Sequence, residues 1–194
     1  DNASDDIKVV LCDDIKGDIM IHEKAGKDVI INGNDKKYDG TIKIHNGSSY
    51  NDGTVTIENV NFETSTASLN FIMPNDFDVV NGVTRRYSQN VTVSNCTFIA
   101  TGEAENTAVG IQAKSSKNLQ VINCTATNMH SLIQAQSCGE NVEVKNCTVT
   151  GKNGVAFKQV KSTLVEGCTI EADEYGIRYD GNIDNYGIIV RGND

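Results

Sequence analysis

Five polar residues of this sequence occupy similar places in short apolar segments. Gln112, Gln134, Lys158 and Arg178, together with Lys43, each lie in or beside a run rich in Val, Ile and Ala. Side chains alternate between two faces of an extended chain, so apolar neighbours that turn inward leave these five facing outward in one stripe. Amide, ammonium and guanidinium groups in a row are donors for sugar hydroxyls or for a carboxylate. The alternative is an ordinary solvated strand face.

The longest irregular segment, residues 73–89, gathers aromatic and charged residues. Phe77 and Tyr87 offer flat apolar faces on which a sugar ring would rest. The candidate ligand-binding residues of this segment are Asp76, Phe77, Asp78, Arg85, Arg86 and Tyr87. The alternative is a tolerated surface insertion, because lengthening a loop costs little free energy.

The sequence contains no recognisable catalytic pair. A glycoside hydrolase needs two carboxyl groups flanking the scissile bond, but the paired aspartates at 13–14 and 76–78 fall in expected loops. The histidines at 22, 45 and 130 are scattered, although the first two follow similar runs and are candidate neighbours. No catalytic residue is therefore assigned.

The elements that must position these residues are internal repeats. The segments Val91–Phe98, Leu119–Ala126, Val142–Val149 and Thr163–Ile170 alternate apolar and polar residues around Asn-Cys-Thr, with Gly replacing Asn in the last. Weaker copies precede and follow them, and each repeat contains a second strand-like run without helical period. This pattern predicts an all-β fold, a parallel β-helix (solenoid) of about seven coils. A β-sandwich or barrel is the alternative, but neither explains why one triplet recurs in register.

Stacking coils about 4.8 Å apart places equivalent residues in ladders. We expect a buried Asn ladder that hydrogen-bonds along the stack, at a turn where Asn and Gly tolerate left-handed backbone. The cysteines beside it are expected to be small packing residues, not disulfides or zinc ligands, because stacked side chains point in parallel. The ladder positions are Asn59, Asn95, Asn123, Asn146, Cys96, Cys124, Cys147 and Cys168.

Composition and charge limit the remaining choices. The 194 residues suit a single domain overall, with residues 1–26 as an N-terminal capping coil and 27–194 as the solenoid. Lys and Arg number 17 against 26 Asp and Glu, and the net charge of −9 argues against a nucleic-acid partner. No apolar run reaches the roughly 18 residues of a membrane span. A last coil without a polar cap predicts that the polypeptide continues or that a partner covers this end.

On its Val-x-Val-x-Asn-Cys-Thr rungs, over residues 27–194, the sequence resembles the right-handed parallel β-helix family, the pectate-lyase-like superfamily. Its opening, residues 8–33, looks like the first coils of bacterial secreted and cell-surface members, which implies that localisation. The catalytic motifs of the family do not map onto this chain. No metal site or cofactor is expected; the alternative is calcium, for which the candidate ligands are Asp173, Glu174, Asp180 and Asp184.

We therefore expect a secreted or cell-surface β-helix module without catalytic activity, which binds glycan or a host or other surface partner, or serves as an adhesin stalk. A polysaccharide lyase or glycoside hydrolase is the second hypothesis, in which Lys158 and Arg178 stabilise a uronate. A segment resembling a phage tail fibre is the third. The oligomeric state stays open.

Overall fold

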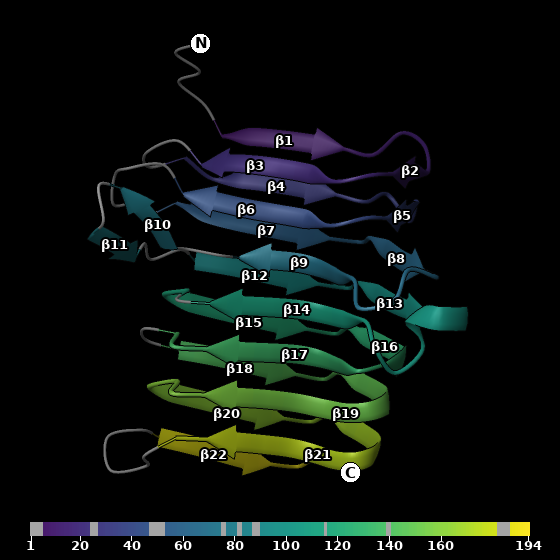
Figure 1. Cartoon of the computed structure of the whole chain (residues 1–194), viewed down its shortest axis with the longest axis vertical. Helices are drawn as coiled ribbons and strands as arrows, with labels where there is room; N and C mark the ends of the chain where they lie inside the picture. Colours follow the sequence, from purple (N-terminus) through teal and green to yellow (C-terminus); the bar gives the residue numbers. More distant parts are fainter. Residues whose placement is uncertain are drawn as a thin grey trace.

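In a computed structural model the chain forms a solenoid of stacked strands (Figure 1). The structure describes residues 6–23, 27–46, 53–74, 77–80, 83–86, 90–114, 116–138, 141–181 and 187–194. One flat side of the solenoid is an eight-stranded sheet, called sheet 1. Its strands, in order, are β1 (Ile7–Val10), β4 (Val29–Asn32), β7 (Thr54–Glu58), β12 (Asn90–Ser94), β15 (Asn118–Ile122), β18 (Asn141–Lys145), β20 (Ser162–Glu166) and β22 (Gly187–Arg191).

Sheet 2 has twelve strands in two limbs that meet at β19 (Thr148–Lys158). The first limb contains β2 (Ile15–Lys16), β5 (Lys37–Asp39), β8 (Asn61–Thr64), β13 (Thr97–Ala100) and β16 (Thr125–Met129). The second contains β3 (Ile19–Glu23), β6 (Ile42–Asn46), β9 (Asn70–Pro74), β14 (Val109–Lys114) and β17 (Ser131–Gln136). β19 pairs with both β16 and β17, and β21 (Thr169–Asp180) pairs with β19 along both limbs.

Two further elements lie outside these sheets. The strands β10 (Phe77–Val80) and β11 (Val83–Arg86) form a separate antiparallel hairpin (Figure 1). A short 3-10 helix, η1 (Gly102–Ala104), interrupts the coil between β13 and β14. No helix in the described ranges is long and apolar enough to cross a membrane.

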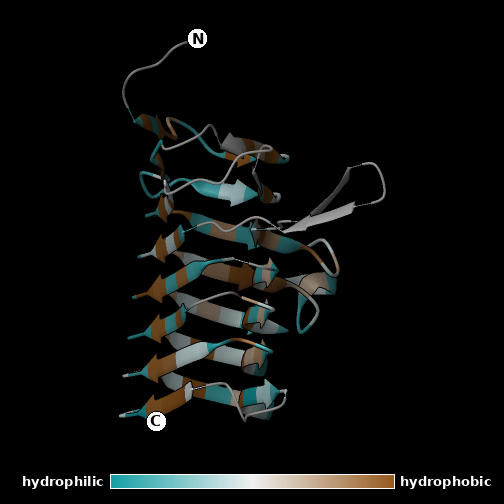
Figure 2. Ribbon diagram, turned by 90° about the vertical axis from the view of Figure 1, so that its left-hand side faces the viewer, coloured by the Kyte–Doolittle hydropathy of each residue, from teal (hydrophilic) through white to brown (hydrophobic). Residues whose placement is uncertain are grey.

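Each coil runs from a strand of sheet 1 through the two limbs of sheet 2 and back. Every pairing within sheets 1 and 2 is parallel and joins strands of neighbouring coils; Val91, for example, lies between Val55 and Leu119. Figure 2 shows the coils stacked in one column between the two ends of the chain. The predicted solenoid is confirmed, and the alternative of a β-sandwich or barrel is wrong.

The core is built from the inward residues of every coil. Strands such as β7 and β12 alternate buried and half-buried residues, as the period of two predicts. Aromatic rings stack where the first limb faces the interior: the rings of Phe62 and Phe98 are parallel within 1° at a centroid distance of 4.9 Å. Tyr38 packs edge-on against Phe62 at 5.6 Å. Because each ring is covered by coils on both sides, the core is continuous along the stack.

The Asn ladder marks the turn from sheet 1 into the first limb of sheet 2. Asn59, Asn95, Asn123 and Asn146 have φ between 52° and 55°, and Gly167 and Gly192 take the same place with φ of 64° and 59°. The turn therefore requires left-handed backbone, as expected. The expectation that these Asn side chains are buried is wrong: Asn59 is half-buried and the other three are exposed.

The cysteine column lies directly inside this turn. Cys96, Cys124, Cys147 and Cys168 are 1–2 % exposed, and none of the six cysteines is in a disulfide. The Cys147 thiol donates to the carbonyl oxygen of Lys145 at 3.3 Å. Its hydrogen bond with the Cys124 thiol and its burial raise its pKa to about 12. The pKa values of the Cys124 and Cys168 thiols are also raised, whereas the hydrogen bond with Cys124 lowers the pKa of Cys96. All four side chains are buried in the core, so they serve as packing residues.

Candidate functional site

A groove of about 310 Å³ runs across the second limb of sheet 2, over β14, β17, β19 and β21. Its polar lining comes from two columns of outward side chains and from two further residues: His130, just before β17, and Tyr175, within β21. We call it the Arg178 groove. It lies where sequence analysis expected the polar stripe, because Ile111 and Ile133 of the same strands turn inward and are buried.

The pairing of neighbouring strands defines the two columns. The first column is Gln112, Gln134, Ala156 and Arg178. The second column is Lys114, Gln136, Lys158 and Asp180. The prediction of a single stripe is therefore corrected in one respect: Lys158 lies one column away from Gln134 and Arg178. Both columns line the groove, so the structure still brings Gln112, Gln134, Lys158 and Arg178 together.

Lys43 is part of the first column but lies nearer the N-terminal end. It pairs with Met73, whose neighbour Ile72 pairs with Ile111, so Lys43 and Gln112 are two coils apart. The Lys43 ammonium nitrogen lies 2.7 Å from an Asp18 carboxylate oxygen. Lys43 is absent from the lining of the Arg178 groove. An ion pair on the surface is therefore its observed role.

Arg178 is held in place by two neighbours on its own strand. Its Nε lies 2.8 Å from Oδ2 of Asp180, and its Nη1 donates to the Tyr175 hydroxyl at 3.1 Å. The guanidinium carbon also lies 5.2 Å from the centre of the Tyr175 ring. The hydrogen bonds with Asp180 and Tyr175 raise the pKa of the Arg178 guanidinium. Arg178 thus presents a fixed positive charge, with donor hydrogens left over for a ligand.

The groove is cationic although the protein as a whole is acidic. Lys114, Lys158 and Arg178 line it together with a single carboxylate, that of Asp180. Neither Lys114 nor Lys158 forms an ion pair with any residue that the structure describes. Two unneutralised ammonium groups in a shallow groove attract an anion locally, even on a chain of net charge −9.

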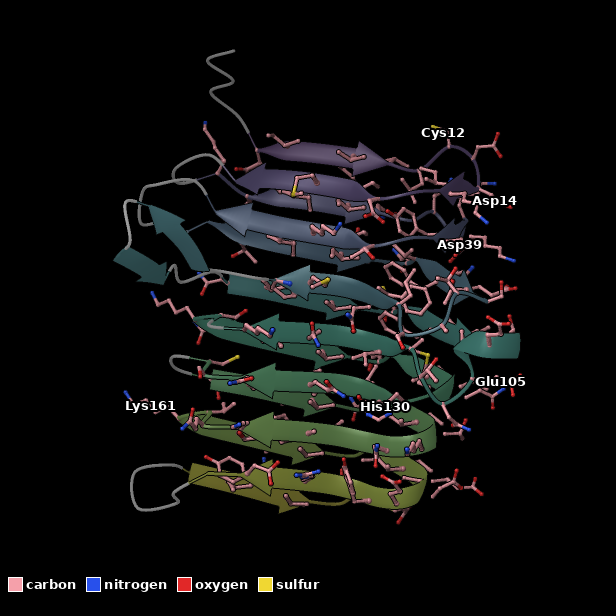
Figure 3. The ribbon with its side chains drawn as sticks, viewed as in Figure 1. Cys12, Asp14, Asp39, Glu105, His130 and Lys161 are labelled. Carbon is pink, nitrogen blue, oxygen red and sulfur yellow. The ribbon has the colours of Figure 1, made fainter. Side chains whose placement is uncertain are left out.

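His130, labelled in Figure 3, also lines the groove. It lies between β16 and β17, and its Nδ1 is 3.3 Å from the carbonyl oxygen of Asn106. This contact joins the groove to the turn that follows η1. With Nδ1 as the donor to that carbonyl, Nε2 is the nitrogen that remains for a ligand.

Sequence reasoning missed the contributions of His130 and Tyr175. Tyr175 lies three residues before Arg178, and an odd spacing places two residues on opposite faces of a regular strand. The pairing of β19 with β21 shifts between Gly151 and Asn153, and Asn153 pairs with Tyr175. That shift lies before Tyr175 and leaves the pairing from Tyr175 to Arg178 regular, so no local pattern around Tyr175 predicts that its side chain reaches the groove.

The segment 73–89 is only partly covered by the structure. Its backbone forms the β10–β11 hairpin, in which Phe77 pairs with Arg86 and Asp78 with Arg85. The side chains of these four residues, and the whole of Asp76 and Tyr87, lie outside the described residues. The candidate binding role of this segment therefore stays a prediction.

The described lining of the Arg178 groove does not contain a pair of carboxylates. Asp180 is the one carboxylate of the Arg178 groove, and it is paired with Arg178. Asp14 accepts a hydrogen bond from the Lys37 backbone N–H at 2.9 Å, which gives it a structural role. His22 and His45 are neighbours in the pairing of β3 with β6, as the sequence suggested.

Side chains that could bind a metal ion do not cluster in the described part of the chain. Among the described residues, no three His, Cys, Asp or Glu side chains gather in a way that would hold a metal ion. Of the candidate calcium ligands, Glu174 is 3.4 Å from the Lys152 ammonium nitrogen and Asp180 pairs with Arg178, while Asp184 lies outside the described residues. Calcium binding stays a prediction without further support.

Comparison with known proteins agrees with this architecture. A family model described as the right-handed beta helix region matches residues 19–194. Neither the curated proteins nor the solved structures gave a significant match. The matched region includes every strand of sheet 2 except β2, and the whole Arg178 groove. The chain therefore belongs to the right-handed β-helix family.

Proposed function

We propose that the protein is a non-catalytic carbohydrate-binding module, and that the Arg178 groove holds an acidic glycan such as a uronate-containing chain. The observation that carries the proposal is the clustering of Lys114, Lys158 and Arg178 beside three glutamines. Ammonium and guanidinium groups bind carboxylates, while Gln112 and Gln134 both donate to and accept from hydroxyls. A secreted or cell-surface location suits such a module and is part of the proposal.

Binding is favoured over hydrolysis because the groove lining contains too few carboxylates for a glycoside hydrolase. A glycoside hydrolase requires two carboxyl groups on either side of the scissile bond. The groove lining supplies one, Asp180, and its Oδ2 lies 2.8 Å from Nε of Arg178, so this carboxylate is already engaged. A polysaccharide lyase or glycoside hydrolase is the second hypothesis, in which Lys158 and Arg178 stabilise the carboxylate of a uronate.

Calorimetric titration with a galacturonate oligomer tests the proposal, with the methyl-esterified form of the same oligomer as the ligand control. We expect the acid form to bind and the ester to bind much more weakly. Lys158→Ala and Arg178→Ala should each weaken binding about tenfold, because each removes one charge-assisted hydrogen bond. Lys161→Ala is the matched control, since this exposed lysine lies in the turn after β19 and outside the groove (Figure 3).

Reducing-end release from the same oligomer, with and without calcium, separates a module from an enzyme. We expect none. Release that disappears in Lys158→Ala or Arg178→Ala would establish an enzyme in this groove. Equal binding of the acid and the ester, or binding of neither, would show that the groove does not recognise carboxylates.

A further inference from the structure

A second hollow lies on sheet 1, on a different side of the solenoid from the Arg178 groove. Its volume is about 250 Å³, and it extends across β7, β12, β15 and β18. Its polar lining consists of six uncharged side chains: Thr54, Asn90, Thr92, Asn118, Gln120 and Asn141. We call it the amide furrow.

Strand pairing arranges these side chains in two rows along the solenoid axis. Thr54, Asn90, Asn118 and Asn141 form one row across four coils. Thr92 and Gln120 belong to the next outward row, two residues further along each strand. Neighbouring members of a row are about 4.8 Å apart, the spacing of hydrogen-bonded strands. A linear ligand that follows the axis would therefore meet one polar side chain at each coil.

The amides are oriented by hydrogen bonds within the furrow and just outside it. Asn118 Nδ2 donates to Asn90 Oδ1 at 2.8 Å. The Glu143 carboxylate accepts from Asn141 Nδ2 at 2.9 Å and from Gln120 Nε2 at 3.4 Å. The Lys145 ammonium, 2.6 Å away on the same strand, lowers the pKa of Glu143 and keeps this anchor ionised. The network fixes the amide planes before any ligand arrives, which reduces the entropy lost on binding.

These hydrogen bonds leave some amide acceptors and donors of the furrow unused, so that a ligand can bind them. The carbonyl oxygens of Asn118, Gln120 and Asn141 accept from no residue in the described part of the chain. The amides of Asn118, Gln120 and Asn141 each donate one of their two N–H groups in the network, so the second remains for a ligand. The furrow thus presents acceptors and donors side by side, without a charge. Hydroxyl groups, which donate and accept at once, match that surface better than a carboxylate or an ammonium group does.

We propose that the amide furrow is a second binding site, which takes an uncharged polyhydroxyl chain, that is, a neutral glycan, along the solenoid axis. The proposal does not depend on the Arg178 groove, because the two sites share no residue. An anionic glycan is disfavoured in the furrow because Glu143 lies beside it and no cationic side chain lines it.

Titration with neutral pentasaccharides of glucose, mannose and xylose, followed by the NMR signals of side-chain amides, tests the proposal on the whole chain. We expect at least one pentasaccharide to shift the amide signals of Asn118 and Gln120. Gln120→Ala and Thr92→Ala should each weaken its binding about fivefold, the effect of one hydrogen bond. Thr56→Ala is the matched control, because Thr56 pairs with Thr92 on the neighbouring strand but does not line the furrow.

The side chains that are changed face outward, so thermal unfolding of each variant should stay close to that of the parent chain, which separates binding from folding. The proposal is overturned if none of the three pentasaccharides shifts the Asn118 and Gln120 signals. It is equally overturned if a pentasaccharide binds but Arg178→Ala abolishes the binding and Gln120→Ala leaves it unchanged. In that case the neutral sugar occupies the Arg178 groove.

Discussion

Gly154 should be the glycine on which the Arg178 groove depends most. A Cβ added at Gly154 would lie 2.1 Å from the carbonyl oxygen of Gly176 on the next coil and 2.5 Å from Cγ2 of Ile170. Gly176 lies between Tyr175 and Arg178, so its carbonyl belongs to the backbone that carries the groove. Gly154→Ala therefore has to push β21 away from β19 at the base of the site.

The expected cost follows from these distances. Cβ atoms essentially never approach another heavy atom within 3.0 Å, so the Gly176 carbonyl must move by about an ångström. Displacements of this kind in a packed interior cost about 1–3 kcal/mol. Gly176→Ala is the matched control, because its Cβ would meet nothing closer than 3.6 Å. Both substitutions reduce the freedom of the unfolded chain by the same amount, so this contribution cancels in their difference.

Urea unfolding, followed by circular dichroism, measures that difference. We expect Gly154→Ala to be less stable than Gly176→Ala by about 1–3 kcal/mol. Gly154→Ala should also bind the galacturonate oligomer more weakly, since Tyr175 and Arg178 are displaced together. If the two alanine variants unfold at the same urea concentration, the close approach of β19 and β21 at this glycine does not limit stability, and the reasoning is refuted.

Substitutions at three further positions address the turn, the core and the surface network. Asn146→Ala should cost about 1–2 kcal/mol in urea unfolding because alanine resists the φ of 53° at this turn, whereas Asn146→Gly should be nearly neutral, as Gly167 in the same slot suggests. Thr163→Val should stabilise the protein by about 1 kcal/mol, because the buried Thr163 hydroxyl has no hydrogen-bond partner among the described residues; a loss of stability would reveal a partner. The hydrogen bond from Lys145 lowers the pKa of Glu143, so its contribution is present above the unfolded-state pKa of about 4 and is lost as the pH falls through the lower folded-state pKa. Glu143→Gln should remove that acid-dependent loss, which is below about 1 kcal/mol for a partly exposed pair; unfolding free energies of both proteins between about pH 6 and pH 2 check this.

The fold could be predicted from the sequence because the repeated Asn-Cys-Thr triplet reflects the backbone and packing requirements of one turn in the coil. The turn between sheet 1 and sheet 2 needs left-handed backbone, which Asn and Gly accept, and the next position points into a narrow corner of the core, where Cys fits. Those two demands recur together in the four successive coils of Cys96, Cys124, Cys147 and Cys168, so they show as an in-register repeat. The exposure of Asn95, Asn123 and Asn146 shows that the backbone conformation, and not burial of the amide, selects asparagine there.

The groove was harder to predict. Alternation of apolar and polar residues shows which side chains face outward, but it does not show which residues of neighbouring strands are paired. A single stripe requires Lys158 to pair with Gln134, whereas the structure pairs Lys158 with Gln136, two residues further along. A shift of two residues keeps Lys158 on the outer face and moves it by one column. The long strands β19 and β21 and the irregular pairing near Gly151 set this register, and their lengths cannot be read from the apolar pattern.

The solenoid separates stability from recognition by the direction in which side chains point. Inward residues must stack on the coils above and below, and they are apolar in nearly every coil. Outward residues have no such partners, so sheet 1 carries an uncharged amide furrow while sheet 2 carries a cationic groove on the same set of coils. Substitutions at Lys158, Arg178 or Gln120 should therefore change binding with little effect on unfolding, whereas Gly154→Ala should change both. Binding and unfolding measured together on these four variants show whether recognition is confined to the outward rows.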